Sequence, residues 1–138
     1  MKSKTIEKPQ LFSGPVAAGF PSPASDYIEG KLDLNEYLVK HPAATFFVRA
    51  SGDSMTGAGI FPGDILIVDR SMKAMDSNIV IASIDGEFIV KRLRVSDAGI
   101  SLVSENKRYK PIEIGDGNDF KVWGVVTYVI HNTVTRNS

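Results

Sequence analysis

The sequence predicts a mostly-β fold, a barrel or sandwich with one short helix and an extended N-terminal arm. Short apolar runs, separated by turns rich in Gly, Pro and Asp, fill the chain after residue 45. A helical pattern appears only once, before these runs. Many short strands joined by such turns are typical of barrels and sandwiches. With 138 residues, of which 43% are hydrophobic, the chain has the size and the apolar content of one domain.

The first 24 residues are rich in Lys, Pro, Ser, Gly and Ala, which predicts an extended arm. Pro9, Pro15, Pro21 and Pro23 lack an amide hydrogen and disfavour a helix at the residue before each of them. We place the arm at residues 1–32 and a β domain at residues 33–138. An extended arm has the conformation in which proteases usually bind their substrates.

The segment Asp33-Leu-Asn-Glu36 has the pattern of an N-terminal capping box, with Asp33 as the cap. Apolar residues then recur at helical spacing, and Pro42 prevents the helix from continuing. The pattern predicts a short helix over residues 33–40.

The β pattern consists of short apolar runs between turns, and Asp85-Gly86 is a dipeptide favoured in two-residue type I′ hairpins. This hairpin joins two of the expected strands. The expected strands are residues 45–50, 65–68, 78–84, 87–93, 100–103 and 122–130.

Composition excludes several classes of function. Sixteen basic residues balance sixteen acidic ones without a long basic run, which argues against sequence-specific or phosphate-driven binding of nucleic acid. The chain has no cysteine and no apolar segment near the roughly 20 residues of a membrane span, so we expect a soluble cytoplasmic protein that does not bind membranes. His41 and His131 lack ligand spacing, and we expect neither a metal nor another cofactor.

Ser54 and Lys91 offer a nucleophile and a base without any histidine. Ser54 lies in a glycine-flanked turn after an apolar run, where backbone N–H groups can approach an oxyanion. Lys91 alternates onto the same side of its strand as Ile89 and Leu93, so we expect it to be buried. Burial lowers the pKa of a lysine and leaves it neutral more often, as a general base must be.

Other interpretations of these residues stay open from chemistry alone. Ser51 is a rival nucleophile, and a serine in a turn or a lysine on a strand usually has no catalytic role. Arg92 cannot act as the base, because a guanidinium does not lose its proton in proteins. The small residues Ala17-Ala18-Gly19 in the arm supply a third element, a peptide that the pair could cut.

Several motifs resemble the UmuD branch of the LexA-type self-cleaving Ser–Lys peptidases. The similarity covers most of residues 11–130. Its motifs are Ala50-Ser-Gly-Asp-Ser-Met55, Gly59-Ile-Phe-Pro-Gly-Asp-Ile-Leu-Ile-Val-Asp69, Asp85-Gly-Glu-Phe-Ile-Val-Lys-Arg-Leu93, Gly19-Phe-Pro-Ser-Pro-Ala-Ser-Asp-Tyr27 and Asp33-Leu-Asn35.

The resemblance implies a mostly-β fold of the LexA/signal-peptidase type and cleavage between Ala18 and Gly19. It implies Ser54 as the nucleophile and Lys91 as the general base. It also implies a homodimer, activation by RecA filaments on single-stranded DNA, and a trimmed form that joins a UmuC-like, Y-family polymerase subunit. About 18 residues precede the expected cut, so we do not expect the DNA-binding domain of a repressor.

We therefore expect a self-cleaving accessory subunit of an error-prone translesion polymerase. Two alternatives are a signal-peptidase-like protease, which needs a membrane anchor, and a β domain that only binds a partner. The sequence leaves open whether cleavage occurs within one subunit or across a dimer.

Overall fold

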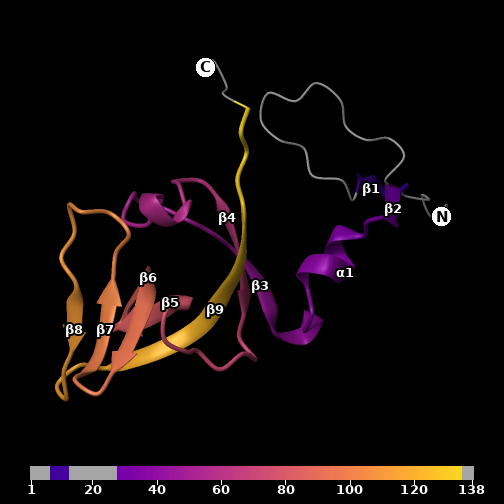
Figure 1. Ribbon diagram of the computed structural model, residues 1–138. Coiled ribbons are helices and arrows are strands. Elements are labelled where there is room, and N and C mark those ends of the chain that lie inside the picture. The colour runs from indigo at the N-terminus through magenta and orange to yellow at the C-terminus, as the bar shows by residue number, and fades with distance from the viewer. Residues whose placement is uncertain (1–6, 13–27, 135–138) are drawn as a thin grey trace. The chain divides into compact units, whose positions relative to one another are not determined.

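The computed structural model describes residues 7–12 and 28–134, and the mostly-β fold with one short α-helix is confirmed (Figure 1). Turns rich in Gly, Pro and Asp separate the strands, as the sequence pattern predicts. The elements are β1 (Gln10–Phe12), β2 (Ile28–Lys31), α1 (Leu34–Leu38), the 3-10 helix η1 (Pro42–Ala44), β3 (Thr45–Arg49), the 3-10 helix η2 (Thr56–Ala58), β4 (Ile65–Asp69), β5 (Ile79–Ile84), β6 (Glu87–Ser96), β7 (Gly99–Val103), β8 (Ile112–Ile114) and β9 (Phe120–Ile130).

The chain divides into two units, residues 1–39 and 40–138, and each is described by itself. In the first unit, β1 and β2 form an antiparallel pair, with Gln10 opposite Lys31. The backbone N–H of Leu32 donates to the carbonyl of Pro9 at 2.8 Å, which extends this pairing by one more bond. The described part of the arm is therefore extended, and backbone hydrogen bonds hold its two ends together.

Helix α1 begins where the capping pattern predicts. The Asp33 carboxylate accepts hydrogen bonds from the backbone N–H groups of Asn35 and Glu36, at 3.0 and 3.3 Å. These bonds satisfy two N–H groups that have no partner within the helix. The helix ends at Leu38, two residues earlier than predicted, because Val39 adopts an extended conformation.

The second unit contains a seven-stranded sheet in the order β3-β4-β9-β5-β6-β7-β8, with antiparallel neighbours throughout. The long strand β9 pairs with β4 through its second half and with β5 through its first half. Its register shifts once against each partner, and such bulges bend a strand and increase its twist. Figure 1 shows β9 curving between β4 and the hairpins formed by β5–β8.

The six strands expected from the sequence of this unit are all present, with small changes at their ends. β6 continues to Ser96, beyond its expected end at Leu93, because its last residues pair with β7. The short strand β8 was not predicted. The Asp85-Gly86 hairpin is confirmed, and its two turn residues have positive φ angles of 48° and 89°, as a type I′ turn requires.

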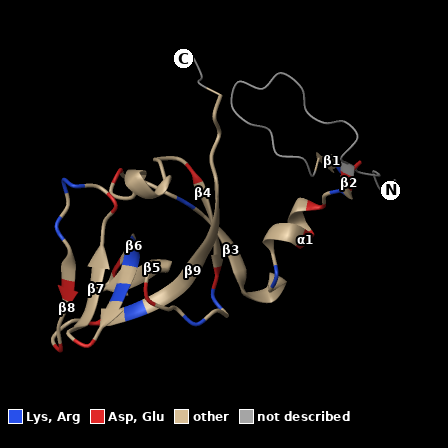
Figure 2. Cartoon of the chain, viewed as in Figure 1, with Lys and Arg blue, Asp and Glu red and all other residues tan. Residues whose placement is uncertain are grey.

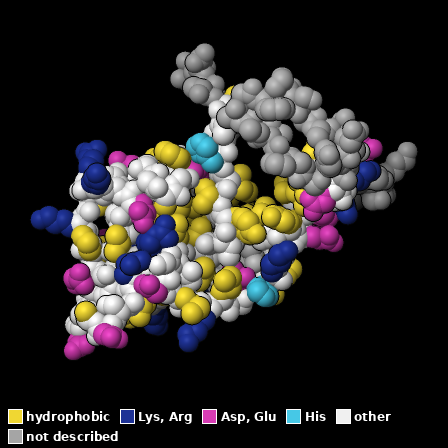
Figure 3. Space-filling view, in the orientation of Figure 1, with side chains coloured by type: hydrophobic (Ala, Val, Ile, Leu, Met, Phe, Trp, Pro, Cys, Tyr) yellow, Lys and Arg dark blue, Asp and Glu magenta, His cyan; other side chains and the backbone are white. Residues whose placement is uncertain are grey.

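The core of this unit consists of two apolar clusters on opposite sides of β5. Ile81 belongs to the first cluster and the neighbouring Val80 to the second, and both are buried. Because successive side chains of a strand point to opposite faces, both faces of β5 are covered. In the space-filling view, hydrophobic side chains gather near the middle of this unit and charged ones lie mostly toward its rim (Figure 3).

The two histidines pair with buried carboxylates at the ends of β4. His41 Nδ1 lies 2.6 Å from Asp69 Oδ2, and His131 Nδ1 lies 2.6 Å from Asp64 Oδ1. Burial alone would raise the pKa of Asp69, but hydrogen bonds from His41 and from Ser71 outweigh it and lower that pKa to about 2. Each pair ties β4 to a segment distant in the sequence.

Many of the other charged side chains lie on β6, at the start of β9 and in the connecting loops (Figure 2). No helix within residues 7–12 and 28–134 is long and apolar enough to cross a membrane.

Candidate active site

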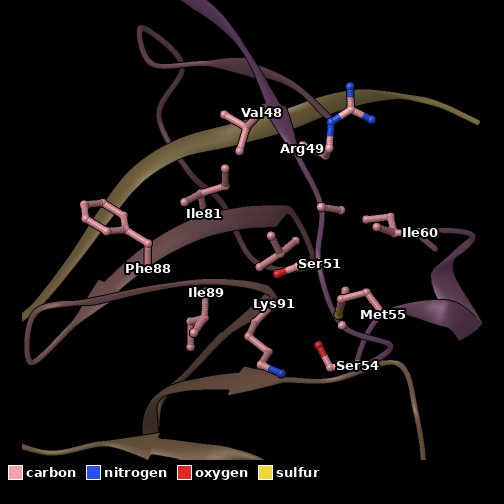
Figure 4. A pocket seen from close by; sticks show the side chains of 13 residues that line it. Val48, Arg49, Ser51, Ser54, Met55, Ile60, Ile81, Phe88, Ile89 and Lys91 are labelled. Atoms are coloured by element: carbon pink, nitrogen blue, oxygen red, sulfur yellow. The ribbon is translucent and has the colours of Figure 1, made fainter. Parts of the chain in front are cut away.

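A pocket of about 350 Å³ lies between the segment from β3 to η2 and the strands β5 and β6. Apolar side chains form much of its wall, among them Val48 from β3, Ile81 from β5 and Ile89 from β6. Four polar or charged side chains, those of Arg49, Ser51, Ser54 and Lys91, also line it (Figure 4). The pocket therefore brings both predicted catalytic residues, and the rival serine, into one cavity.

Lys91 is buried, with 8% of its surface exposed. It lies opposite Val80 in the β5–β6 ladder, and the side chain of Leu93, two residues along the same face, is buried as well. Loss of hydration lowers the pKa of its ammonium below the ordinary value of 10.5. The apolar surroundings predicted from strand alternation are confirmed, and they favour the neutral amine that a general base needs.

Ser54 lies in the turn that connects β3 to η2. Gly52 begins this turn with a φ of 77°, in the left-handed region that glycine adopts without strain. Two backbone hydrogen bonds hold Ala50, the residue directly after β3: Ala50 N–H donates to Asp64 O at 2.8 Å, and Gly63 N–H donates to Ala50 O at 2.9 Å. Met55, the residue after Ser54, is buried in the first core cluster, so the serine is fixed on both sides.

The side chains of Ser54 and Lys91 point toward one another at one end of the pocket (Figure 4). Ser51 lies farther from the amine in the same view. Arg92 does not line the pocket, because its guanidinium donates to Glu105 Oε1 at 2.5 Å and to the Ser77 carbonyl at 2.6 Å. The expected cleavage site, Ala18–Gly19, lies outside the described residues.

The segment 104–109, which follows β7, contacts Lys91 and the turn that carries Ser54, and it was not singled out from the sequence. Lys91 Nζ donates a hydrogen bond to Ser104 Oγ at 2.7 Å, and the ring centroid of Tyr109 lies 5.1 Å from the same nitrogen. On the other side, Tyr109 donates its hydroxyl hydrogen to Asp53 Oδ1 at 2.5 Å. Asn106 Nδ2 donates to the backbone oxygen of Asp53 at 2.8 Å.

The Asp53–Tyr109 contact changes the acidity of both groups. The hydroxyl of Tyr109, and the charge of Arg108 more weakly, lower the pKa of Asp53, and the Asp53 carboxylate raises the pKa of Tyr109. Asp53 is therefore a stable carboxylate and Tyr109 a stable phenol at neutral pH. Both are suited to hold the turn of Ser54 and neither to exchange a proton in the reaction.

The described residues contain no group of three or more His, Asp and Glu side chains placed to hold a metal ion. A serine that faces a buried amine can attack a carbonyl once the amine takes its proton.

Comparisons with known proteins place the chain in a family. Residues 10–127 match the model of the family described as Peptidase S24-like. The chain is 49% identical to protein ImpA of Salmonella typhimurium over 124 residues, which is 89% of this chain and 83% of that protein. It is 46% identical to protein MucA of Escherichia coli over 114 residues, which is 82% of this chain and 77% of that protein.

A more distant relative is the LexA repressor of Dechloromonas aromatica, 37% identical over 126 residues. This match covers 91% of the chain and 62% of the repressor. The family model spans most of the chain, and two of these relatives exceed 45% identity over most of both lengths. The chain therefore belongs to the Peptidase S24-like family of self-cleaving Ser–Lys peptidases and, within it, to the UmuD-like proteins of SOS mutagenesis.

Proposed function

We propose that the protein cuts its own Ala18–Gly19 bond, with Ser54 as the nucleophile and Lys91 as the general base. The observation that carries this assignment is that Ser54 and the buried Lys91 line one pocket, with their side chains pointing toward one another (Figure 4). Ser51 shares the pocket, but it is exposed and lies farther from the amine. A base must be within reach of the proton that it removes, which favours Ser54.

The reaction proceeds in two steps. Ser54 Oγ attacks the carbonyl carbon of Ala18 while its proton passes to the lone pair of neutral Lys91 Nζ. The resulting ammonium returns this proton to the amide nitrogen of Gly19, which leaves as a free amine, and Ala18 remains as an ester on Ser54. Lys91 then takes a proton from water, and the hydroxide attacks the ester carbonyl. The bond between Ala18 and Ser54 Oγ breaks, the Lys91 ammonium passes its proton to Oγ, and Ala18 is released with a free carboxyl group.

The arm enters the pocket as an extended peptide in this proposal. Small residues at the bond let its backbone approach the serine closely, and the apolar wall formed by Val48, Ile81 and Ile89 accepts neighbouring side chains. Backbone N–H groups of the glycine-flanked turn stabilise the oxyanion. The assignment of residues 1–32 as the arm and 33–138 as the peptidase domain belongs to the same proposal.

We place this activity in the cytoplasm, in a homodimer that is the accessory subunit of an error-prone polymerase. A RecA filament on single-stranded DNA stimulates the cut, and the trimmed form joins a UmuC-like, Y-family catalytic subunit. Support comes from membership of the UmuD-like group, which includes ImpA, SamA and MucA.

The first prediction concerns the two candidate residues. Purified protein incubated at pH 10 should lose its first 18 residues, giving a product that begins at Gly19. Ser54→Ala and Lys91→Ala should each stop this reaction almost completely, because two groups that act as a unit lose most of their effect when either is removed. Intact mass and N-terminal sequencing follow the reaction over time.

Ser51→Ala and Lys121→Ala serve as matched controls, since the first changes the rival serine and the second an exposed lysine on β9. Both should cleave at the parental rate. Cleavage by the Ser54→Ala protein, or its loss only in Ser51→Ala, would reassign the nucleophile. A parent that stays intact at every pH, alone and with the filament, would leave the β domain as a non-catalytic binding module.

A further inference from the structure

Lys91 has one hydrogen-bond partner among the residues that the structure describes. Its Nζ donates to Ser104 Oγ at 2.7 Å. The last pair of the β6–β7 ladder is Arg92 and Val103, so Ser104 lies one position beyond the ladder, directly across from Lys91. The proposed reaction assigns no role to this hydroxyl.

A neutral amine has two N–H groups and one lone pair, and only the lone pair can take the proton of Ser54. Rotation about the Cε–Nζ bond would otherwise turn the lone pair away from the nucleophile. We infer that Ser104 is a positioning residue. Its hydroxyl oxygen accepts a hydrogen bond from one N–H of Lys91, and this bond keeps the lone pair of the amine directed toward Ser54. This inference rests on the proposed function.

The segment that carries Ser104 is fixed to the turn of the nucleophile. Gly57 N–H donates to Glu105 O at 2.7 Å, and Asn106 Nδ2 donates to Asp53 O at 2.8 Å. The neighbours of Ser104 are therefore bonded to residues on both sides of Ser54. A hydroxyl held in this way orients the lysine relative to the serine, not only relative to its own strand.

The surroundings of the amine contain few groups that could replace this hydroxyl. Val80 faces Lys91 from β5 and is apolar, and Tyr109 presents its ring face from the segment 104–109. The nearby carboxylates are engaged, Asp53 by Tyr109 and Glu105 by Arg92. Loss of the Ser104 hydroxyl should therefore leave the amine without a fixed acceptor.

The decisive comparison is between Ser104→Thr and Ser104→Val, which have nearly the same shape and differ in the hydroxyl. We expect the valine protein to cleave about 10- to 100-fold more slowly at its alkaline plateau, a part of the roughly 10²–10⁴-fold that a positioned base contributes. The threonine protein should keep most of the parental plateau. Ser104→Ala removes the same hydroxyl without adding volume, and it should cleave as slowly as Ser104→Val. It serves as a second test in case the valine variant does not fold.

The pH profile separates positioning from a loss of packing. A hydroxyl oxygen accepts a stronger hydrogen bond from an ammonium than from a neutral amine, so its removal should lower the pKa of Lys91. The cleavage midpoint of Ser104→Val should then move to lower pH while its plateau falls. A variant that had merely lost packing would show a lower plateau with an unmoved midpoint.

NMR titration of Lys91 in the Ser54→Ala background gives a readout that does not depend on cleavage. The pKa of Lys91 should be lower in the Ser104→Val protein than in the Ser104→Thr protein, which are otherwise identical. The positioning role would be overturned if both Ser104 variants kept the parental cleavage plateau and midpoint, or if Lys91 had the same pKa in both. Neither result would contradict the proposed function. Parental cleavage by Lys91→Ala would instead overturn the proposed function.

Discussion

Burial of Lys91 has a cost for folding and, in the proposed reaction, a use in catalysis. Its ammonium is buried among apolar side chains, and Ser104 is its hydrogen-bond partner within the described residues. Loss of hydration lowers its pKa, which means that the folded protein holds the proton less tightly than the unfolded chain does. A residue chosen for stability alone would be apolar here.

This argument predicts that Lys91→Met stabilises the protein at neutral pH, by ~1–2 kcal/mol if it resembles other stabilising changes at functional sites. The sign follows from linkage. Below the folded pKa both states are protonated and the cost is complete; between that pKa and 10.5 the unfolded state binds more protons, so the stability of the parent rises with pH. The advantage of methionine should therefore shrink as pH approaches 10.5.

Denaturant unfolding at several pH values, in the Ser54→Ala background to prevent cleavage, measures this difference. Lys121→Met provides the control, because Lys121 is exposed and its replacement should change little. An advantage of methionine that stayed constant up to pH 10.5 would show that the ammonium is not the source of the cost.

At the scale of elements, the segment 104–109 holds the turn of Ser54 through a close backbone approach. A Cβ atom added at Gly57 would lie 2.5 Å from the carbonyl oxygen of Glu105, which is backbone and cannot simply rotate away. The same oxygen accepts the Gly57 N–H. Any side chain at position 57 must therefore separate the two segments.

Gly57→Ala should lower the free energy of unfolding by ~1–3 kcal/mol, the usual cost of overpacking. The folded fraction of this variant should also cleave more slowly at pH 10 than the folded parent does. The reason is that the substitution moves the turn of Ser54 away from the segment 104–109, which holds Lys91. Gly117→Ala is the control, since no heavy atom lies within 4 Å of its added Cβ. Thermal unfolding measures the change in stability and mass spectrometry measures the cleavage rate. Parental values in both would show that the close approach of Gly57 to Glu105 does not hold the turn of Ser54.

The elements that the sequence predicted correctly are those with strong local signals. The Asp33 cap marks the start of α1, and Asp85-Gly86 marks the β5–β6 hairpin. β8 has only three residues, directly after Pro111, which is too few for an alternating pattern. The bends of β9 come from pairing with two different strands, which is a tertiary effect.

The sequence singled out the two candidate residues that the structure places in one pocket, but not the residues that hold them in position. Lys91 was recognisable by alternation with Ile89 and Leu93. Ser104 required the register of the β6–β7 hairpin, in which Ser96 pairs with Gly99 across a two-residue turn. Continuing that register places Ser104 opposite Lys91, so a signal exists in the sequence, but it depends on recognising a turn without a strong turn motif.

At the scale of the whole molecule, the expected substrate and the proposed catalytic pair belong to different parts of one chain. Ala18–Gly19 precedes the unit of residues 40–138 that contains Ser54 and Lys91. Self-cleavage then requires a conformer in which the arm occupies the pocket. An activator can favour this conformer only by binding it more tightly than the others.

The pH dependence of cleavage tests how such an activator works. Without an activator, the rate should rise from neutral pH toward pH 10, because only neutral Lys91 can accept the proton of Ser54 and burial already lowers its pKa. A docked arm would exclude more water from the amine and lower this pKa further. A RecA filament that favours the docked conformer should therefore raise the rate at pH 7 much more than at pH 10.

The measurement compares cleavage rates at pH 7 and pH 10, with the filament and with single-stranded DNA alone as the control. Equal stimulation at both pH values would show that the filament promotes docking without changing the protonation of Lys91.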